Sequence, residues 1–204
     1  DVIATWARIM SQVPNSRFYL KCKQLRDERV RGLVRAGFAA AGIAPERIEM
    51  QAFLPSVSEH LNKYAEVDLA LDPFPYNGTT TTCEAMWMGV PVLTIRGDNH
   101  RSRVGASLLH AVGIAEDFVA SDVDDYVGRA VAMAKDPTRL AALRATLRQR
   151  MAKSPLCDET GFTRDLEAIY HALWRRWCAG PETYMLKAPP DLRPEDSIQD
   201  RKST

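Results

Sequence analysis

The chain has 204 residues, of which 46% are hydrophobic, so it is long and apolar enough to bury the core of one ordinary domain. Its 27 Lys and Arg residues balance 26 Asp and Glu residues to a formal net charge of +1, which gives no electrostatic reason to expect nucleic acid or an acidic membrane surface as a partner. Apolar runs stay well short of the about 18 residues that cross a membrane, and the first residues lack the order of a signal peptide, so we expect no membrane partner.

The first third of the chain alternates helical and strand-like patterns. Apolar residues recur at helical spacing until Pro14-Asn15-Ser16 breaks the pattern. Ser56 and Glu59 have the spacing of a capping box, which predicts the start of a short helix. The predicted helices are 2–13, 26–43 and 56–64, and the predicted strands are 17–22, 48–53 and 67–71.

The middle of the chain continues the same alternation. A polar loop, 72–79, leads into a helix over 80–88, followed by a strand over 90–95 and a helix over 103–112 with Gly113 placed for its C-cap. Short apolar strands alternating with amphipathic helices predict an α/β fold: a Rossmann-like, doubly wound, mostly parallel sheet with flanking helices. Such folds bind ligands beyond the carboxyl ends of the strands.

After Gly113 the pattern is helical, with helices predicted over 121–135, 136–153 and 160–178. We expect the aromatic residues of the last helix, Tyr170, Trp174 and Trp177, to pack into a core or against a part of the protein outside this chain. The prolines and charges beyond Gly180 indicate a tail without a fold of its own. The predicted organisation is therefore one Rossmann-like domain, 1–180, and an extended or disordered tail, 181–204.

The loop before the helix at 80–88 carries the clearest chemical signal. The first N–H groups of a helix lack intrahelical partners and the helix dipole adds partial positive charge, so Gly78 and the threonines after it predict an anion site at the carboxyl edge of the sheet. Glu84, one helical turn after Thr80, is placed to reach a pair of ribose hydroxyls. An ordinary N-cap with a polar first turn, and a glutamate matched to the helix dipole, explain the same residues without a ligand.

The sequence LDPFPYNGTTTTCEAMWMGVPVLTIRGDNHRSRVGASLLHAVGI, residues 71–114, resembles the C-terminal catalytic half of the O-linked N-acetylglucosamine transferases and their relatives, the SPINDLY-type O-fucosyltransferases. The resemblance extends over residues 1–180, including PNSRFYL and MAKSPLCDETGFTRDLEAIYHALW. It implies the donor-binding half of a GT-B glycosyltransferase, which moves a sugar from UDP-N-acetylglucosamine, or from GDP-fucose, to Ser or Thr hydroxyls of a protein. It also implies an N-terminal catalytic half and tetratricopeptide repeats in the same protein, and neither a cofactor nor a metal.

The resemblance assigns roles to particular positions. It places the donor diphosphate at Gly78, Thr79, Thr80 and Thr81, and the ribose at Glu84, where the family usually has Asp. It places the base and donor pocket at Leu54, Val57, His60 and Lys63. The diphosphate-binding lysine of the family corresponds to a segment ahead of this chain, and the catalytic residues are expected mainly in the N-terminal half.

Several other interpretations stay open at this point. His60 also fits a structural cap of a short helix, and Lys63 an ordinary solvated lysine. A dinucleotide-binding domain would need GxGxxG after the first strand, where the chain has Lys23-Gln24-Leu25-Arg26. A nucleotide- or protein-binding module without catalysis is a further alternative. The basic residues His100, Arg101 and Arg103 follow the next strand, and we expect Arg103 to cap or pair structurally.

The four cysteines, Cys22, Cys83, Cys157 and Cys178, are widely spaced and form no CxxC pair. This spacing favours neither a zinc site nor a redox motif, and it indicates a reducing, cytoplasmic location. The chain begins inside a helical pattern without an initiator methionine, which we interpret as a piece of a longer protein.

Overall fold

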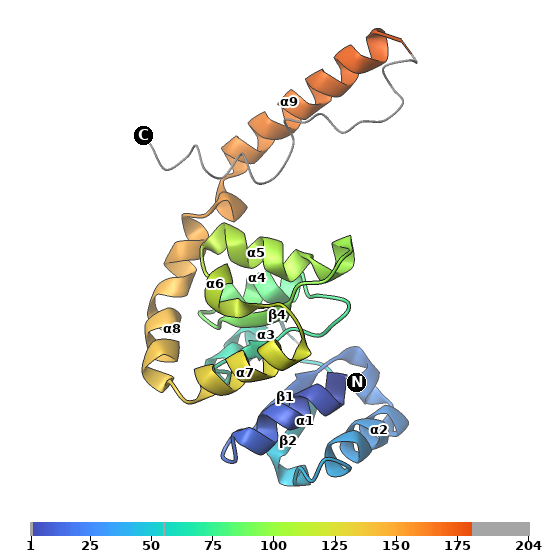
Figure 1. Cartoon of the computed structure of the whole chain (residues 1–204), viewed down its shortest axis with the longest axis vertical. Helices are drawn as coiled ribbons and strands as arrows, with labels where there is room; N and C mark the ends of the chain where they lie inside the picture. Colours follow the sequence, from blue (N-terminus) through green and yellow to red (C-terminus); the bar gives the residue numbers. More distant parts are fainter. Residues whose placement is uncertain (1, 55, 181–204) are drawn as a thin grey trace. The chain divides into compact units, whose positions relative to one another are not determined.

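The computed structural model describes residues 2–54 and 56–180, and it divides into a unit that ends at Cys157 and a second unit that begins at Asp158 (Figure 1). This boundary precedes residue 180, where the sequence places the end of the domain. The predicted tail, 181–204, lies outside the described residues.

The first unit begins with a parallel two-stranded sheet and its helices. Strand β1 pairs with β2 in a register that runs from Phe18 opposite Ile48 to Lys21 opposite Gln51. Phe18 packs between two buried aromatic rings, with ring centroids 5.0 Å from Trp6 and 5.2 Å from Phe38. These elements are α1 (Val2–Gln12), β1 (Phe18–Lys21), α2 (Glu28–Ala39) and β2 (Ile48–Gln51).

A second sheet, with strand order β3-β4-β5, forms the remainder of the first unit, and both of its pairings are parallel. Its strands are β3 (Ala70–Leu71), β4 (Val92–Ile95) and β5 (Val119–Ala120). Its helices are α3 (Val57–Asn62), α4 (Thr80–Trp87), α5 (Val104–Val112), α6 (Ala115–Phe118), α7 (Val123–Ala134) and α8 (Pro137–Ala152). Short 3-10 helices cover Lys23–Arg26, Pro45–Arg47, Lys63–Glu66, His100–Ser102 and Pro155–Cys157.

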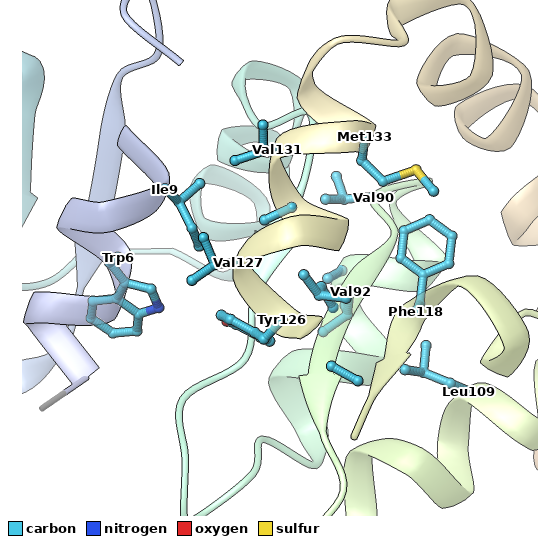
Figure 2. Close-up of a cluster of buried hydrophobic side chains, with 14 of the residues drawn as sticks. Trp6, Ile9, Val90, Val92, Leu109, Phe118, Tyr126, Val127, Val131 and Met133 are labelled. Carbon is cyan, nitrogen blue, oxygen red and sulfur yellow. The ribbon is translucent and has the colours of Figure 1, made fainter. Parts of the chain in front are cut away.

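Helix α7 carries the core that joins the two sheets. Figure 2 shows Tyr126 and Val127 of α7 between Trp6 and Ile9 of α1 on one side and Val92 of β4 on the other. All five side chains are buried and belong to one apolar cluster. Burial of such side chains, at about 25 cal/mol per Å² of apolar area, is the main force that holds the two sheets together.

The predicted parallel α/β architecture is confirmed by the three parallel pairings, but the details differ in two ways. Beyond Gly113 the sequence predicts only helices, and this is wrong at Val119–Ala120, which forms β5 beside β4. A two-residue strand is too short to show an alternating pattern, so its sequence carries no strand signal. The strand predicted over 67–71 pairs only at Ala70–Leu71, and the pairings among the described residues form two sheets instead of one.

The second unit contains helix α9, Glu159–Cys178, which begins after Asp158, whose carboxylate accepts a hydrogen bond from the Gly161 N–H at 2.8 Å. Tyr170, Trp174 and Trp177 are exposed, at 61%, 65% and 60%. The expectation that they pack into a core or against a part of the protein outside this chain stays a prediction. None of the helices within residues 2–54 and 56–180 is long and apolar enough to cross a membrane.

Candidate functional site

The start of helix α4 is open to solvent. Thr79 occupies the N-cap position without a side-chain capping hydrogen bond, and Thr79, Thr80 and Thr81 are all exposed. Because the first N–H groups of a helix have no partners inside it, those of Thr80 and Thr81 are available to an anion. The loop 72–79 connects the carboxyl end of β3 to this helix start, and the sequence predicts a ligand at that edge of the sheet.

Asp72, which the sequence analysis did not single out, fixes the loop between β3 and α4. Its side chain is buried: Oδ1 accepts a hydrogen bond from the Gly78 N–H at 2.7 Å, and Oδ2 accepts one from the Thr94 hydroxyl of β4, also at 2.7 Å. Its backbone carbonyl accepts a hydrogen bond from the buried Tyr126 hydroxyl at 3.0 Å. The Gly78 amide is therefore already paired. A Cβ at this position would lie 2.7 Å from Oγ1 of Thr81 and 2.8 Å from Oγ1 of Thr82, so the loop needs glycine here to pack against the start of α4.

Burial raises the pKa of Asp72 to about 6, while the hydrogen bonds from Gly78 and Thr94 oppose the shift. The cause is that a buried carboxylate loses hydration that two hydrogen bonds only partly replace. Near neutral pH the loop is thus anchored on a carboxylate whose charge is disfavoured by its surroundings.

Asn77 ties the same loop to the segment after β4. It is 2% exposed; its N–H donates to the Arg101 carbonyl at 2.9 Å, and its Oδ1 accepts from the Gly105 N–H of α5 at 3.4 Å. Arg101 thus contacts the loop through its backbone. Arg103 occupies the N-cap position of α5, as the expectation of a structural cap requires, but its side chain makes no capping hydrogen bond.

A predicted pocket residue and the predicted ribose-binding residue meet at α4. His60 of α3 and Glu84 of α4 form a hydrogen bond of 2.9 Å between Nε2 and Oε2. Lys21, the last residue of β1, contacts Nδ1 of the same ring. Burial lowers the pKa of Lys21, and the negative charge of Glu84 opposes that shift. Sequence reasoning missed Lys21, although its position at the carboxyl end of a predicted strand was a usable signal.

The other predicted pocket residues lie apart from this group. The Lys63 ammonium lies 2.7 Å from Oε2 of Glu66 and 3.1 Å from Oε1 of Glu49, and it sits 4.9 Å from the centroid of the Tyr19 ring. Its hydrogen bonds to Glu66 and then to Glu49 raise the pKa of Lys63. Lys63 is therefore held by carboxylates instead of being a freely solvated lysine.

Leu54 lies on the connection between β2 and α3, and Val57 begins α3. Leu54 is half-buried, and Val57, the first residue of α3, is 74% exposed. The predicted capping box of Ser56 and Glu59 at the start of α3 is confirmed, with both of its hydrogen bonds formed. It sets where α3 starts and hence the direction in which His60 points.

A pocket of about 160 Å³ lies beside α4, with Tyr64, Asp72, Thr81 and Thr82 among its lining residues. The Tyr64 hydroxyl donates to the Thr81 carbonyl at 3.4 Å, and burial raises the pKa of Tyr64 to about 12. The volume of this pocket is below the roughly 300 Å³ at which small-molecule pockets begin. Across the described ranges, 2–54 and 56–180, no group of three His, Cys, Asp or Glu side chains is arranged to hold a metal.

Parallel strands, flanking helices and an open helix start at the carboxyl edge of the sheet define a Rossmann-like α/β protein. The family model for Glycosyl transferase family 41 matches residues 1–166, and the chain belongs to this family.

The relatives include long proteins. A Solanum lycopersicum protein named as a probable UDP-N-acetylglucosamine–peptide N-acetylglucosaminyltransferase SPINDLY is 45% identical over 179 residues, which is 88% of this chain and 19% of that protein. A Caenorhabditis elegans UDP-N-acetylglucosamine–peptide N-acetylglucosaminyltransferase is 30% identical over 86% of this chain and 15% of its own length. The chain thus spans about a fifth of the length of the curated relatives it matches.

A solved structure supports the fold. The Thermobaculum terrenum O-GlcNAc transferase, as a K341M mutant, superposes with a TM-score of 0.81 at 34% sequence identity, covering 87% of this chain and 34% of that one. The predicted relation to the O-GlcNAc transferase and SPINDLY family, and the α/β half of a GT-B enzyme, are confirmed.

Proposed function

We propose that this chain is the donor-binding half of a protein O-glycosyltransferase, which moves N-acetylglucosamine from UDP-N-acetylglucosamine to Ser or Thr hydroxyls. The observation that carries the proposal is the exposed start of α4 at the carboxyl end of β3, in a chain of Glycosyl transferase family 41. The names of its relatives, as peptide N-acetylglucosaminyltransferases, support the choice of donor and acceptor.

The proposed chemistry is stabilisation of the leaving diphosphate. Negative charge develops on that group as the sugar departs, and N–H donors and the dipole of α4 oppose it, with the hydroxyls of Thr79, Thr80 and Thr81 adding further donors. The loop of Gly78 lets the diphosphate approach the backbone closely. In this proposal the site needs no metal and no cofactor.

The remaining assignments complete the donor site. Glu84 accepts from the ribose hydroxyls, and His60 lies beside it, as their hydrogen bond supports. Leu54, Val57 and Lys63 lie on the side toward the base. The small pocket supports a site completed by the N-terminal half of the same protein, which would also carry acceptor binding and tetratricopeptide repeats. The free cysteines support a reducing, cytoplasmic location.

A titration of the chain with nucleotides tests the proposal. We expect UDP to raise its unfolding temperature and to give a saturable binding isotherm. A clear preference for GDP would replace the donor with GDP-fucose, a preference for NAD would indicate a dinucleotide-binding domain, and no response to any of them would indicate an interaction module.

A threonine substitution tests the role of α4. We expect Thr80→Ala with Thr81→Ala to weaken UDP binding about tenfold, because two hydroxyl hydrogen bonds of about 0.5 to 1 kcal/mol each are lost while the N–H donors remain. Calorimetric titration measures the change. Thr138→Ala, at an exposed position in the first turn of α8, is the matched control. Equal affinity of the double variant and the control would remove the two threonine hydroxyls from the proposed site.

A further inference from the structure

Three polar side chains from three elements form a chain of contacts beside the start of α4. Lys21 ends β1, His60 lies on α3 and Glu84 lies on α4. The Lys21 ammonium contacts Nδ1 of His60, and Nε2 of His60 lies 2.9 Å from Oε2 of Glu84. The two ring nitrogens of His60 are therefore both engaged, one by a cation and the other by an anion.

The chemistry of the three groups fixes where the imidazole proton sits. A lysine ammonium has three donors and no acceptor, so Nδ1 of His60 accepts from Lys21 and carries no proton. A carboxylate is only an acceptor, so Nε2 carries the proton and donates it to Glu84. A doubly protonated ring would direct its Nδ1–H at the ammonium. The arrangement thus selects the neutral Nε2–H tautomer.

This tautomer has a consequence for Glu84. The hydrogen bond from His60 occupies Oε2, and within the described part of the chain no hydrogen bond to Oε1 is formed. The carboxylate side chain is 28% exposed. One oxygen is therefore held by the ring, and the other remains as an acceptor. The contact depends on Lys21 in particular, because the Lys63 ammonium is already bound by Glu49 and Glu66.

We propose that Lys21 is a positioning residue of the donor site: it holds His60 in the Nε2–H tautomer, and His60 in turn orients Glu84 for the ribose hydroxyls. This inference rests on the proposed function for the identity of the ligand. Lys21 acts through His60 and does not contact the nucleotide.

Nitrogen-15 NMR of the 204-residue chain tests, without any nucleotide, whether Lys21 holds His60 in the Nε2–H tautomer. At about pH 8.5, where imidazoles are ordinarily neutral, we expect the Nε2–H form in the unmodified protein and in Lys21→Arg, because arginine is also only a donor. In Lys21→Met we expect a substantial Nδ1–H population. Lys23→Met, at an exposed lysine two residues along, makes the same change in charge and should leave the tautomer as it is. An unchanged tautomer in Lys21→Met would overturn the proposal.

Affinity for UDP tests whether Lys21, through His60, orients Glu84 for the ribose hydroxyls. We expect Lys21→Met to weaken UDP binding about tenfold, equivalent to about 1.4 kcal/mol, Lys21→Arg to restore most of it, and Lys23→Met to bind as the unmodified chain does. Restoration by arginine distinguishes a lost contact from a lost fold, and thermal unfolding of each variant checks the fold directly. A Lys21→Met variant that is folded and binds UDP normally would overturn the proposal.

A double-mutant cycle separates positioning from direct contact. If Lys21 acts through Glu84, Lys21→Met should change UDP affinity less than twofold in a Glu84→Gln background. A full tenfold loss in that background would mean that Lys21 touches the nucleotide and would overturn the positioning role. If the unmodified chain bound neither UDP nor GDP, the proposed function would fail, and the NMR result would still decide whether Lys21 sets the His60 tautomer.

Discussion

At the scale of single residues, the site depends on a buried carboxylate that holds backbone in place. Asp72 receives hydrogen bonds from the loop before α4 and from β4, and its carbonyl receives one from α7. A threonine-rich helix start predicts an anion site from the sequence, whereas an aspartate in DPFPYNG predicts only an ordinary turn. Its role becomes visible only when the strands are paired.

The raised pKa of Asp72 predicts how stability depends on pH. Its folded pKa of about 6 exceeds the ordinary value of 3.8, so protonated Asp72 favours the folded state. That contribution is fully present below about pH 3.8 and is lost as the pH rises through about 6. We expect the unfolding free energy of Asp72→Asn, relative to the unmodified chain, to rise by about 1 to 2 kcal/mol between about pH 5 and about pH 8.

Urea unfolding at both pH values measures this difference. Asparagine fits the site because its oxygen accepts from Gly78 while its amide donates to the Thr94 hydroxyl, which can accept. Asp68→Asn removes a charge at an exposed position and is the control. A pH effect of the same size in both variants would show that burial of Asp72 is not its cause.

The sequence allowed only some of the site to be predicted. The open threonines of α4 and the closeness of His60 to Glu84 match the expectation of a site at this edge. Lys21 and Asp72 were missed because their roles come from contacts across 39 and 22 residues of chain, to His60 and Thr94. Local spacing carries no information about such contacts.

At the scale of elements, the loop before α4 and the first turn of α5 approach the carboxylate of Asp72 from different parts of the chain. A Cβ built on Gly105 would lie 2.6 Å from the Thr94 hydroxyl oxygen and 2.7 Å from Oδ2 of Asp72. The first turn of α5 can therefore reach this position only with glycine there. Packing of that turn against β4 thus depends on glycine, which has no side chain, at position 105.

Two glycine substitutions in helices test this point. We expect Gly105→Ala to lower the unfolding free energy by about 1 to 3 kcal/mol because the methyl group overlaps buried polar atoms. Gly128→Ala, in the exposed face of α7 with no atom within 4 Å of the added Cβ, should raise it by about 0.5 to 1 kcal/mol through helix propensity. Chemical denaturation of both variants measures the contrast, and equal effects would refute the close approach.

Element boundaries that have local chemical signals were predictable. The capping box of Ser56 and Glu59 and the left-handed C-cap at Gly113 were both read from the sequence. Strand β5 was not, because Val119 and Ala120 become a strand only by pairing with Thr94 and Ile95 of β4. Capping is local chemistry, whereas pairing of a two-residue strand depends on the whole sheet.

At the scale of the whole molecule, the chain represents about a fifth of its curated relatives. We expect it to bind UDP but to transfer no sugar to an acceptor peptide, because one half of a two-part cleft does not orient both substrates. Mass spectrometry of a peptide incubated with the chain and UDP-N-acetylglucosamine measures transfer. A longer family member assayed beside it is the positive control. Turnover by the chain alone would contradict the proposal that this chain binds the donor while the N-terminal half binds the acceptor.

Architecture was more predictable than its subdivision. The alternation of patterns predicted parallel pairing, and all three pairings of the described residues are parallel. The separation into two sheets and the boundary at Cys157 depend on tertiary contacts, which hydrophobic periodicity does not report.

The anchoring of Asp72 has a consequence for the thermodynamics of binding. Its hydrogen bonds with the loop, with β4 and with α7 all have partners within the chain itself. The backbone at the front of α4 is thus preorganised, and a ligand that arrives there has little loop entropy to remove. Affinity at this edge is then decided by the quality of the contacts, with almost no penalty for arranging them.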